Sequence, residues 1–336
     1  MKNLYKILFF NTMMISTLIA ISSLSWLTTW IGLEMNLLSL MPLMKEFKDK
    51  YSSEATIKYF IIQAMSSALL LFSIILFTNS KNFHIELNFV PSLMVSVALL
   101  LKMGVPPFHF WFPEIMAGLK WEMNYILMTW QKIAPMVLLT YTTYTPMFLS
   151  IIIILSSMIS GLQGINQTCL RKIMAYSSIN HVSWMISALL NSMSIWFYYF
   201  IIYCIINFNI LSIFNSYNIF FMNQLSKLFY FNKKMKFFFM LNFLSMGGLP
   251  PFLGFFPKWM TVNHMIYNNF YLLSILLIIF TLLSLYFYLR ITFSTFSMNS
   301  EESMTKIFNK MSYTQFMMNS LALFGLIICS IFTNFL

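Results

Sequence analysis

Four ionisable side chains lie within long apolar stretches of the chain, where little water surrounds a charge: Glu34, Lys102, Lys132 and Lys258. A charge at the centre of a bilayer costs about 2.5–3.5 kcal/mol on insertion scales, so such residues usually face a protein interior and mark proton relays or ion pathways. A buried lysine also loses its proton readily, because desolvation disfavours the charged form. The set therefore suits proton transfer, with Glu34 as modulator, Lys102 as loading site and Lys132 as relay.

A salt bridge is the plainer interpretation of the same residues. Glu34 and one lysine would then only fix the packing of two helices. Three cations beside one acid leave charges that such a bridge does not satisfy, which favours the relay. Lys132 also has no acidic residue within one helical turn along the sequence.

Two of the lysines flank a repeated motif that breaks a helix. Residues 104–113 (GVPPFHFWFP) recur as residues 248–257 (GLPPFLGFFP), with six of ten positions identical and an offset of 144 residues. Lys102 precedes the first copy, and Lys258 follows the second. A Pro-Pro pair removes two backbone donors and ends a helix. Freed carbonyls at membrane depth are tolerated only inside protein or beside a water-filled cavity, and matching breaks in two halves point to an ion site in a transporter.

The elements that position these residues are predicted to be membrane helices. Hydrophobic residues make up 59% of the chain and charged residues only 9%, whereas a soluble domain carries about 25% charged residues. A span needs about 20 apolar residues. On that basis we expect eleven spans, with the first kept as a helix rather than cleaved as a signal peptide: 4–23, 25–43, 55–78, 89–119, 123–143, 146–169, 172–190, 193–216, 237–266, 270–296 and 312–335.

The two motifs fall on the fourth and ninth of these spans, so the two copies run in opposite directions. This predicts an all-α polytopic membrane protein built from inverted five-helix repeats with two broken helices. The first repeat covers residues 1–143, with its broken helix at 104–113. The second covers residues 144–296, with its broken helix at 247–258, and residues 297–336 form a loop and a final helix.

Lysine and arginine predict the orientation of the spans. Alternating sides places fifteen cations on the side of the N-terminus and Lys81 alone on the other. The N-terminus is therefore expected in the matrix or cytoplasm, and the C-terminus on the opposite side. The net charge of +11 then follows from topology and needs no nucleic acid partner. Arg290 lies outside this count and is expected to extend its charge to the membrane surface.

Other polar residues are weaker candidates. His109 lies within the first break and either relays protons or bonds to the freed carbonyls. His181 lies among serines and an asparagine that could form a water path. Four residues are expected near water at the span edges: His84, His264, Glu114 and Glu122. The sequence has no nucleotide-binding glycine motif and no cysteine cluster, so we predict no metal site and no redox centre in this chain.

The motifs together resemble the antiporter-like membrane subunits of respiratory complex I. The likeness rests on WIGLEMN around Glu34, on LLKMGVPPFHFWFP after Lys102, on TWQK at Lys132, on RKIMAYSSINH before His181 and on GGLPPFLGFFPKW around Lys258. Bacterial members have fourteen helices, and animal members resemble them without the first three, which agrees with eleven. The resemblance implies that Glu34, Lys102, Lys132 and Lys258 occupy proton-path positions.

The resemblance also implies an environment. We expect a core subunit of a proton-translocating NADH:ubiquinone reductase in the inner mitochondrial membrane, in contact with lipids and other membrane subunits of the complex. NADH, FMN, iron–sulfur clusters and ubiquinone would be bound elsewhere in that complex. Two alternatives remain: a free-standing sodium/proton antiporter, which would be expected to keep fourteen helices, and a structural subunit that pumps nothing, which would not need three intramembrane lysines.

Overall fold

The computed structural model describes residues 4–46, 49–80, 89–142, 145–225, 233–297 and 313–333. These residues are almost entirely helical, and among them the only β pairing is an isolated bridge between Cys169 and Phe221. The predicted edge residue His84 lies outside the described residues, and so do six cations of the orientation count: Lys2, Lys48, Lys81, Lys227, Lys306 and Lys310.

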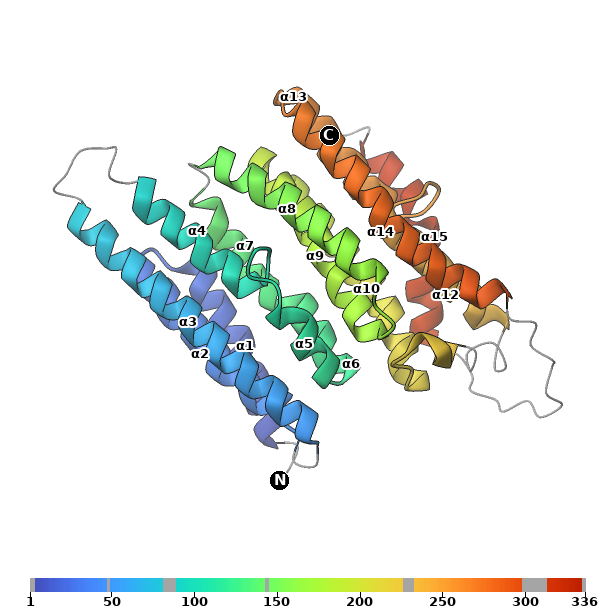
Figure 1. Ribbon diagram of the computed structural model, residues 1–336, viewed down its shortest axis with the longest axis horizontal. Coiled ribbons are helices and arrows are strands. Elements are labelled where there is room, and N and C mark those ends of the chain that lie inside the picture. The colour runs from blue at the N-terminus through green and yellow to red at the C-terminus, as the bar shows by residue number, and fades with distance from the viewer. Residues whose placement is uncertain are drawn as a thin grey trace. The chain divides into compact units, whose positions relative to one another are not determined.

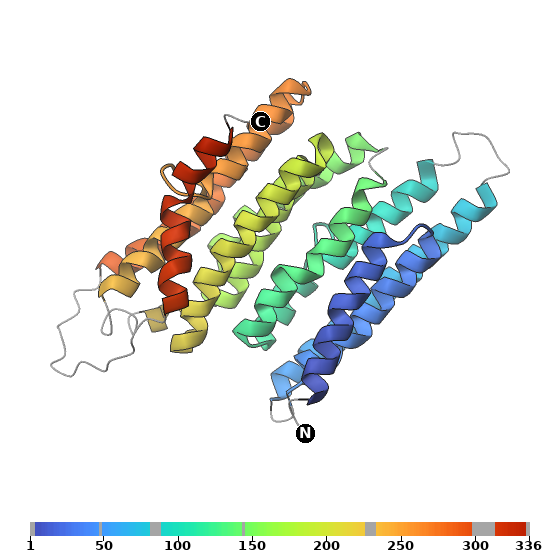
Figure 2. The ribbon, with the colours of Figure 1, turned by 180° about the vertical axis from the view of Figure 1, so that it is seen from behind.

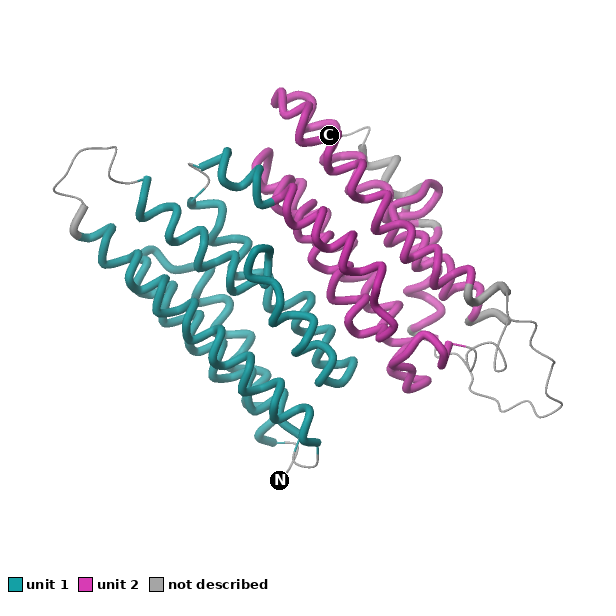
Figure 3. The backbone as a smooth tube through the Cα atoms, viewed as in Figure 1, with its two compact units in different colours: residues 1–152 teal, residues 153–336 magenta. Residues whose placement is uncertain are grey.

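The chain divides into two compact units, residues 1–152 and 153–336 (Figure 3). Unit 1 contains seven described helices and the start of an eighth (Figure 1), as follows: α1 (Leu4–Ser22), α2 (Trp26–Met44), α3 (Lys50–Ser80), α4 (Phe89–Met103), α5 (Trp111–Gly118), α6 (Trp121–Met128), α7 (Trp130–Thr140) and α8 (Pro146–Ile165). Unit 2 contains the rest of α8 and the following elements: α9 (Leu170–Asn191), α10 (Met193–Tyr217), η2 (Met222–Leu225), α12 (Lys233–Gly247), α13 (Phe255–Tyr267), α14 (Tyr271–Ser297) and α15 (Tyr313–Thr333).

Within the described part of the chain, five helices are apolar and long enough to cross a membrane. They are α1, α3 over Lys50–Thr78, α8, α10 and α14 over Tyr271–Phe293. A helical membrane protein is therefore confirmed. Helices also occupy the other six predicted ranges, but crossing by those helices stays a prediction. The predicted boundary between repeats, after residue 143, precedes the boundary between the two units.

Both copies of the repeated motif end a helix in the same way. The amide of Gly104 donates to the carbonyl three residues earlier, over 3.2 Å, and the next amide donates to the carbonyl five residues earlier, over 3.1 Å. Gly248 and its successor make the same two bonds, at 3.0 and 3.3 Å. Both glycines have positive φ, 70° and 79°. This is the Schellman ending, which needs a left-handed residue and therefore favours glycine.

The likeness continues into the helices that follow the breaks. Phe108 and Phe252 each donate their amide to the carbonyl three residues earlier, at 3.0 and 3.1 Å. Phe112 and Phe256 do the same, at 3.0 and 3.2 Å. All four bonds of the first break thus recur at the 144-residue offset, so the sequence repeat is also a repeat of backbone geometry.

The fifth predicted range holds an interruption that its pattern of apolar residues did not predict. Thr129 separates α6 from α7, and its Oγ1 donates to the carbonyl of Tyr125 over 2.7 Å. Pro135 follows inside α7 and has no amide hydrogen for the carbonyl of Gln131. Lys132 therefore lies on a short stretch of helix between two irregular points. Pro135 was the signal in the sequence for this local irregularity.

Within unit 1, α3 and α7 each pack on three other helices. α3 packs on α2, α4 and α5, while α7 packs on α1, α4 and α6. α1 and α2 approach closely at Gly32, where a Cβ atom would lie 2.8 Å from the backbone nitrogen of Ala20. In unit 2, α9 is the central helix, because every residue from 173 to 189 is buried, and α10, α13 and α14 pack around it (Figure 2).

A buried lysine cavity as the candidate functional site

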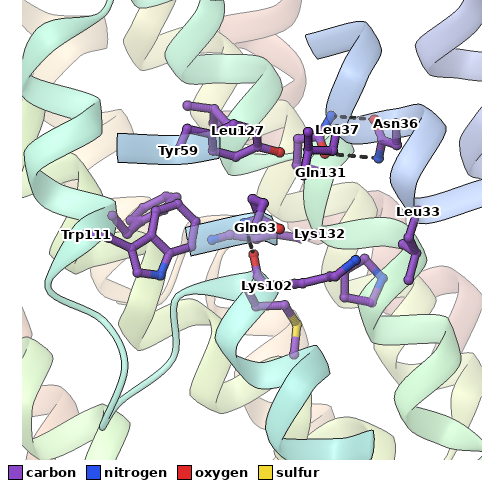
Figure 4. Close-up of a pocket in the computed structure, with 13 residues that line it drawn as sticks. Leu33, Asn36, Leu37, Tyr59, Gln63, Lys102, Trp111, Leu127, Gln131 and Lys132 are labelled. Atoms are coloured by element: carbon purple, nitrogen blue, oxygen red, sulfur yellow. Dashed lines mark hydrogen bonds between the residues drawn. The ribbon is translucent and has the colours of Figure 1, made fainter. Parts of the chain in front are cut away.

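Lys102 and Lys132 line the same cavity in unit 1 (Figure 4). The two side chains retain only 8% and 2% of their exposure. The cavity volume is about 20 Å³, which is room for about one water molecule. Its wall comes from α2, α3, α4, α5, α6 and α7 and consists of these residues: Leu33, Asn36, Leu37, Tyr59, Gln63, Lys102, Met103, Trp111, Phe112, Leu127, Gln131, Lys132 and Pro135.

The helix break positions Lys102. This residue lies in the last turn of α4, two positions before the left-handed Gly104. Its backbone carbonyl accepts a hydrogen bond from Nε2 of Gln63 on α3, over 3.2 Å. The bond ties the end of the broken helix to a neighbouring helix, and it leaves the side chain of Lys102 at the cavity.

Lys132 is held by its short helix and by an aromatic ring. Its Nζ lies 5.2 Å from the ring centroid of Phe112, which belongs to α5 directly after the first break. A cation over an aromatic face is stabilised by the quadrupole of the ring. The break thus supplies one lysine at its start and a ring for the other lysine at its end.

Glu34 lies beside this cavity but not in its wall. It is partly buried on α2, whereas its neighbours Leu33 and Asn36 line the cavity. The carboxylate interacts electrostatically with Lys102, although the two residues form no ion pair among those of the described chain. The predicted pairing of Glu34 with Lys102 in at least one state therefore stays a prediction.

A pair of side-chain amides joins α2 to α7, which no motif in the sequence predicted. Nδ2 of Asn36 donates to Oε1 of Gln131, and Nε2 of Gln131 donates to Oδ1 of Asn36, both over 3.0 Å (Figure 4). Asn36 lies two residues after Glu34, and Gln131 directly precedes Lys132. The two amides hold the helix that carries the acid against the helix that carries a lysine.

Lys258 lies in unit 2, in the first turn of α13, with 8% exposure. Its Nζ donates to the backbone carbonyls of Gly247, over 2.8 Å, and Met246, over 3.3 Å. These residues end α12 at the second break. The same Nζ lies 5.9 Å from the ring centroid of Trp184. The amine of Lys258 therefore donates to two backbone carbonyls and also lies near an aromatic ring.

Both candidate histidines are buried. His109 retains 1% of its exposure within the first break, with its ring centroid 4.3 Å from that of Phe110. His181 lies on the central helix α9, where its Nδ1 is 2.9 Å from the hydroxyl oxygen of Tyr199 on α10. The preceding residue, Asn180, donates from its Nδ2 to Oγ of Ser284 on α14, over 2.9 Å. The predicted polar patch on this span thus joins helices of unit 2, while its role in proton transfer stays a prediction.

Three of the residues predicted at the span edges are described: two are exposed and one is partly buried. Glu114 is exposed and pairs with Lys58, over 2.9 Å. Glu122 is exposed in the first turn of α6, and His264 is partly buried in the last turn of α13. Arg290 directs its guanidinium at the carbonyl end of α8, where it donates to the carbonyl of Ile165 over 2.5 Å.

One ion pair joins the loop after α2 to the loop before α6. Lys120 and Glu46 lie 2.6 Å apart. The hydrogen bond to Glu46 raises the pKa of Lys120 above its ordinary value. Both groups remain in contact with solvent, so such a pair contributes little to stability. The described residues contain no cluster of ligands that could hold a metal ion.

The fold and sequence are similar to those of known proteins. Residues 23–284 match the family described as NADH:quinone oxidoreductase/Mrp antiporter, TM. NADH-ubiquinone oxidoreductase chain 2 of Anopheles gambiae is 43% identical, with 98% of each chain covered. The protein of the same name from Ovis aries is 40% identical, with 86% of this chain and 85% of that protein covered.

Two solved structures share the fold. A chain of respiratory complex I from Thermus thermophilus has a TM-score of 0.85 at 21% identity, covering 96% of this chain and 78% of that one. A chain of the Mrp complex from a Dietzia species has a TM-score of 0.74 at 14% identity, covering 83% of this chain and 58% of that one. Taken with the identity to the curated relatives, these matches show that the chain belongs to the NADH-ubiquinone oxidoreductase chain 2 family.

Proposed function

We propose that this chain is an antiporter-like core membrane subunit of respiratory complex I. It translocates protons across the inner mitochondrial membrane, driven by electron transfer from NADH to ubiquinone in other subunits. Family membership supports the assignment to the complex. The predicted partners are the neighbouring membrane subunits and lipids, and NADH, FMN, iron–sulfur clusters and ubiquinone belong to other chains.

The proton path proposed here consists of Glu34, Lys102, Lys132 and Lys258. One observation carries it: two buried lysines line a single cavity that also has amide and phenol groups in its wall. Burial favours the neutral amine, and water held by polar wall groups would let a proton pass between the two amines. Glu34 interacts with Lys102 electrostatically, so a change in its charge or distance alters the affinity of Lys102 for a proton.

The arrangement in the membrane is also part of the proposal. Eleven spans form two inverted repeats, residues 1–143 and 144–296, followed by a loop and a final helix. The recurrence of four backbone hydrogen bonds at the two breaks supports the repeat. The asymmetry of lysine and arginine favours an N-terminus in the matrix and a C-terminus in the intermembrane space.

Replacing Lys132 tests the path most directly. Lys132→Met keeps the side-chain volume, and Lys132→Ala removes it; both delete the amine. We expect the complex to assemble with either variant and to translocate fewer protons per NADH oxidised. Lys120→Met is the matched control, because it removes an exposed lysine of the same unit. Reconstituted vesicles allow NADH oxidation and acidification to be measured together.

The Lys132 experiment also has a clear negative outcome. If both variants assemble and pump like the parent, Lys132 is not on the path. If the same holds for Lys102→Met and Lys258→Arg, the chain is a structural subunit that pumps nothing.

Exchange of sodium for protons is the second candidate function. The description of the matching family, which names an antiporter, favours it. Two ion fluxes in vesicles that contain the whole complex separate the two functions: the uptake of radioactive sodium and the translocation of protons. Proton translocation of equal extent with and without sodium supports the proton relay. Sodium uptake, with proton translocation that stops when sodium is removed, supports the exchanger.

A further inference from the structure

A carbonyl freed by the helix break is bonded by a side chain in both copies of the motif. At the first break, Nε2 of Gln63 donates to the carbonyl of Lys102 over 3.2 Å. At the second, Nζ of Lys258 donates to the carbonyls of Met246, over 3.3 Å, and Gly247, over 2.8 Å. Lys102 and Met246 are separated by the 144-residue offset of the repeat. The same acceptor therefore has a neutral amide donor in unit 1 and a lysine donor in unit 2.

These carbonyls need a donor because no helix continues beyond them. The last carbonyls of a helix have no partner within it. The Schellman ending supplies amides for the carbonyls two and three positions before the cap, at residues 245 and 244 in the second copy. It leaves Met246 and Gly247 at the end of α12, and a buried carbonyl without a partner costs free energy. The amine of Lys258 fills that gap from the next helix.

The packing around the break fits the lysine closely. A Cβ atom on Gly248 would lie 2.7 Å from Cδ and 3.0 Å from Nζ of Lys258. At the matching Gly104, the nearest atoms are instead the Cβ of Phe112, at 3.0 Å, and the ring of Trp111, at 3.1 Å. The same glycine position thus makes room for a lysine in one unit and for aromatic residues in the other.

We infer that Lys258 is the donor that closes the second helix break, so that its protonation state sets how firmly α12 ends. An ammonium makes charge-assisted hydrogen bonds and is favoured at a helix C-terminus, whereas a neutral amine donates more weakly. A proton leaving Lys258 therefore loosens the break itself. At the first break, Gln63 keeps the bond at every pH. The inference rests on the proposed function only in treating Lys258 as a group that gains and loses protons.

Two substitutions in the complete complex test this role. Lys258→Met keeps a side chain of similar length but has no hydrogen-bond donor. We therefore expect the amount of assembled complex to fall about tenfold, equivalent to about 1.4 kcal/mol. Lys258→Arg keeps several donors and a permanent charge, so we expect normal assembly with proton pumping reduced. Arg290 already makes such bonds in this chain, to the carbonyls of Ile165, over 2.5 Å, and Gln167, over 2.8 Å.

Gln63→Met is the parallel test in unit 1, because it removes the donor to the equivalent carbonyl, that of Lys102, and leaves every lysine side chain in place. Its assembly should fall as it does for Lys258→Met. The inference is overturned if Lys258→Met assembles and melts like the parent, or if Lys258→Arg fails to assemble despite its donors. A separate result bears on the proposed function: an arginine variant that assembles and pumps like the parent removes Lys258 from the proton path and leaves its bond to α12 standing.

Discussion

The apolar surroundings of three lysines predicted their burial, whereas Glu34 is only partly buried; the neutral groups that contact these charges were not predicted. Lys102, Lys132 and Lys258 are all buried, as their apolar surroundings in sequence suggested. Gln63 and the amide pair of Asn36 and Gln131 were not predicted. Side-chain amides are common on helices. Which of them form hydrogen bonds depends on how helices distant in sequence pack against one another.

The amide pair gives a prediction at this scale. Gln131→Leu leaves the buried amide of Asn36 without its partner, which costs about 1–3 kcal/mol. Asn36→Leu leaves the partly buried amide of Gln131 without its partner and should cost less. The double substitution removes both polar groups and should restore most of the loss. A double-mutant cycle on the thermal inactivation temperature of the assembled complex measures this coupling.

The same three variants separate stability from positioning. If the pair positions Lys132 against the helix of Glu34, the double variant regains stability while its ratio of protons to NADH stays low. The exchange of the two residues, Asn36→Gln with Gln131→Asn, keeps both hydrogen-bonding groups and is the control. Additive effects of the single substitutions would show that the two amides do not act as a unit.

At the scale of the element, the Pro-Pro repeat predicted where both helices break. It did not predict how they end. The Schellman bonds, the positive φ of Gly104 and Gly248 and the donors from other helices follow from packing that no short motif records. The interruption at Thr129 was not predicted, since the fifth range is long enough for one continuous span and Pro135 alone marks an irregularity in it. Helix existence therefore follows from composition, whereas helix irregularity follows from individual prolines and glycines.

Two glycines of the breaks make a matched pair of tests. Gly104→Ala should destabilise the complex by about 1–2 kcal/mol, the cost of a left-handed backbone for a residue with a Cβ atom. Contacts at 3.0 Å with Phe112 and 3.1 Å with Trp111 add to this cost. Gly247→Ala should be tolerated, because its Cβ atom would meet nothing nearer than 3.7 Å. Melting curves of the assembled complex compare the two, and equal losses would contradict the backbone argument.

At the scale of the whole molecule, composition was enough to predict a helical membrane protein. The number of crossings depends on more, because polar helices such as α9 are buried within protein and therefore need not be apolar. Every residue of α9 from 173 to 189 is buried, so its serines and asparagines are hidden from lipid. Among the described residues, five helices are apolar and long enough to cross a membrane, whereas the apolar runs of the sequence, supported by the asymmetry of lysine and arginine, predict eleven spans.

The topology prediction separates these two counts. Eleven crossings place the two termini on opposite sides of the membrane, and any even number places them on the same side. We expect an epitope at the N-terminus to be cleaved only when the matrix face is open to protease, and one at the C-terminus only when the intermembrane face is open. Five crossings also give opposite termini, so a third site is needed: a cysteine at Asn268, between α13 and α14. Of the five apolar helices, α1, α3, α8 and α10 precede this site. Nine crossings precede Asn268 in the larger count, and four precede it in the smaller, so a cysteine there should react with a membrane-impermeant thiol reagent from the intermembrane side. Reaction from the matrix side would overturn the eleven-span arrangement and, with it, the inverted repeat.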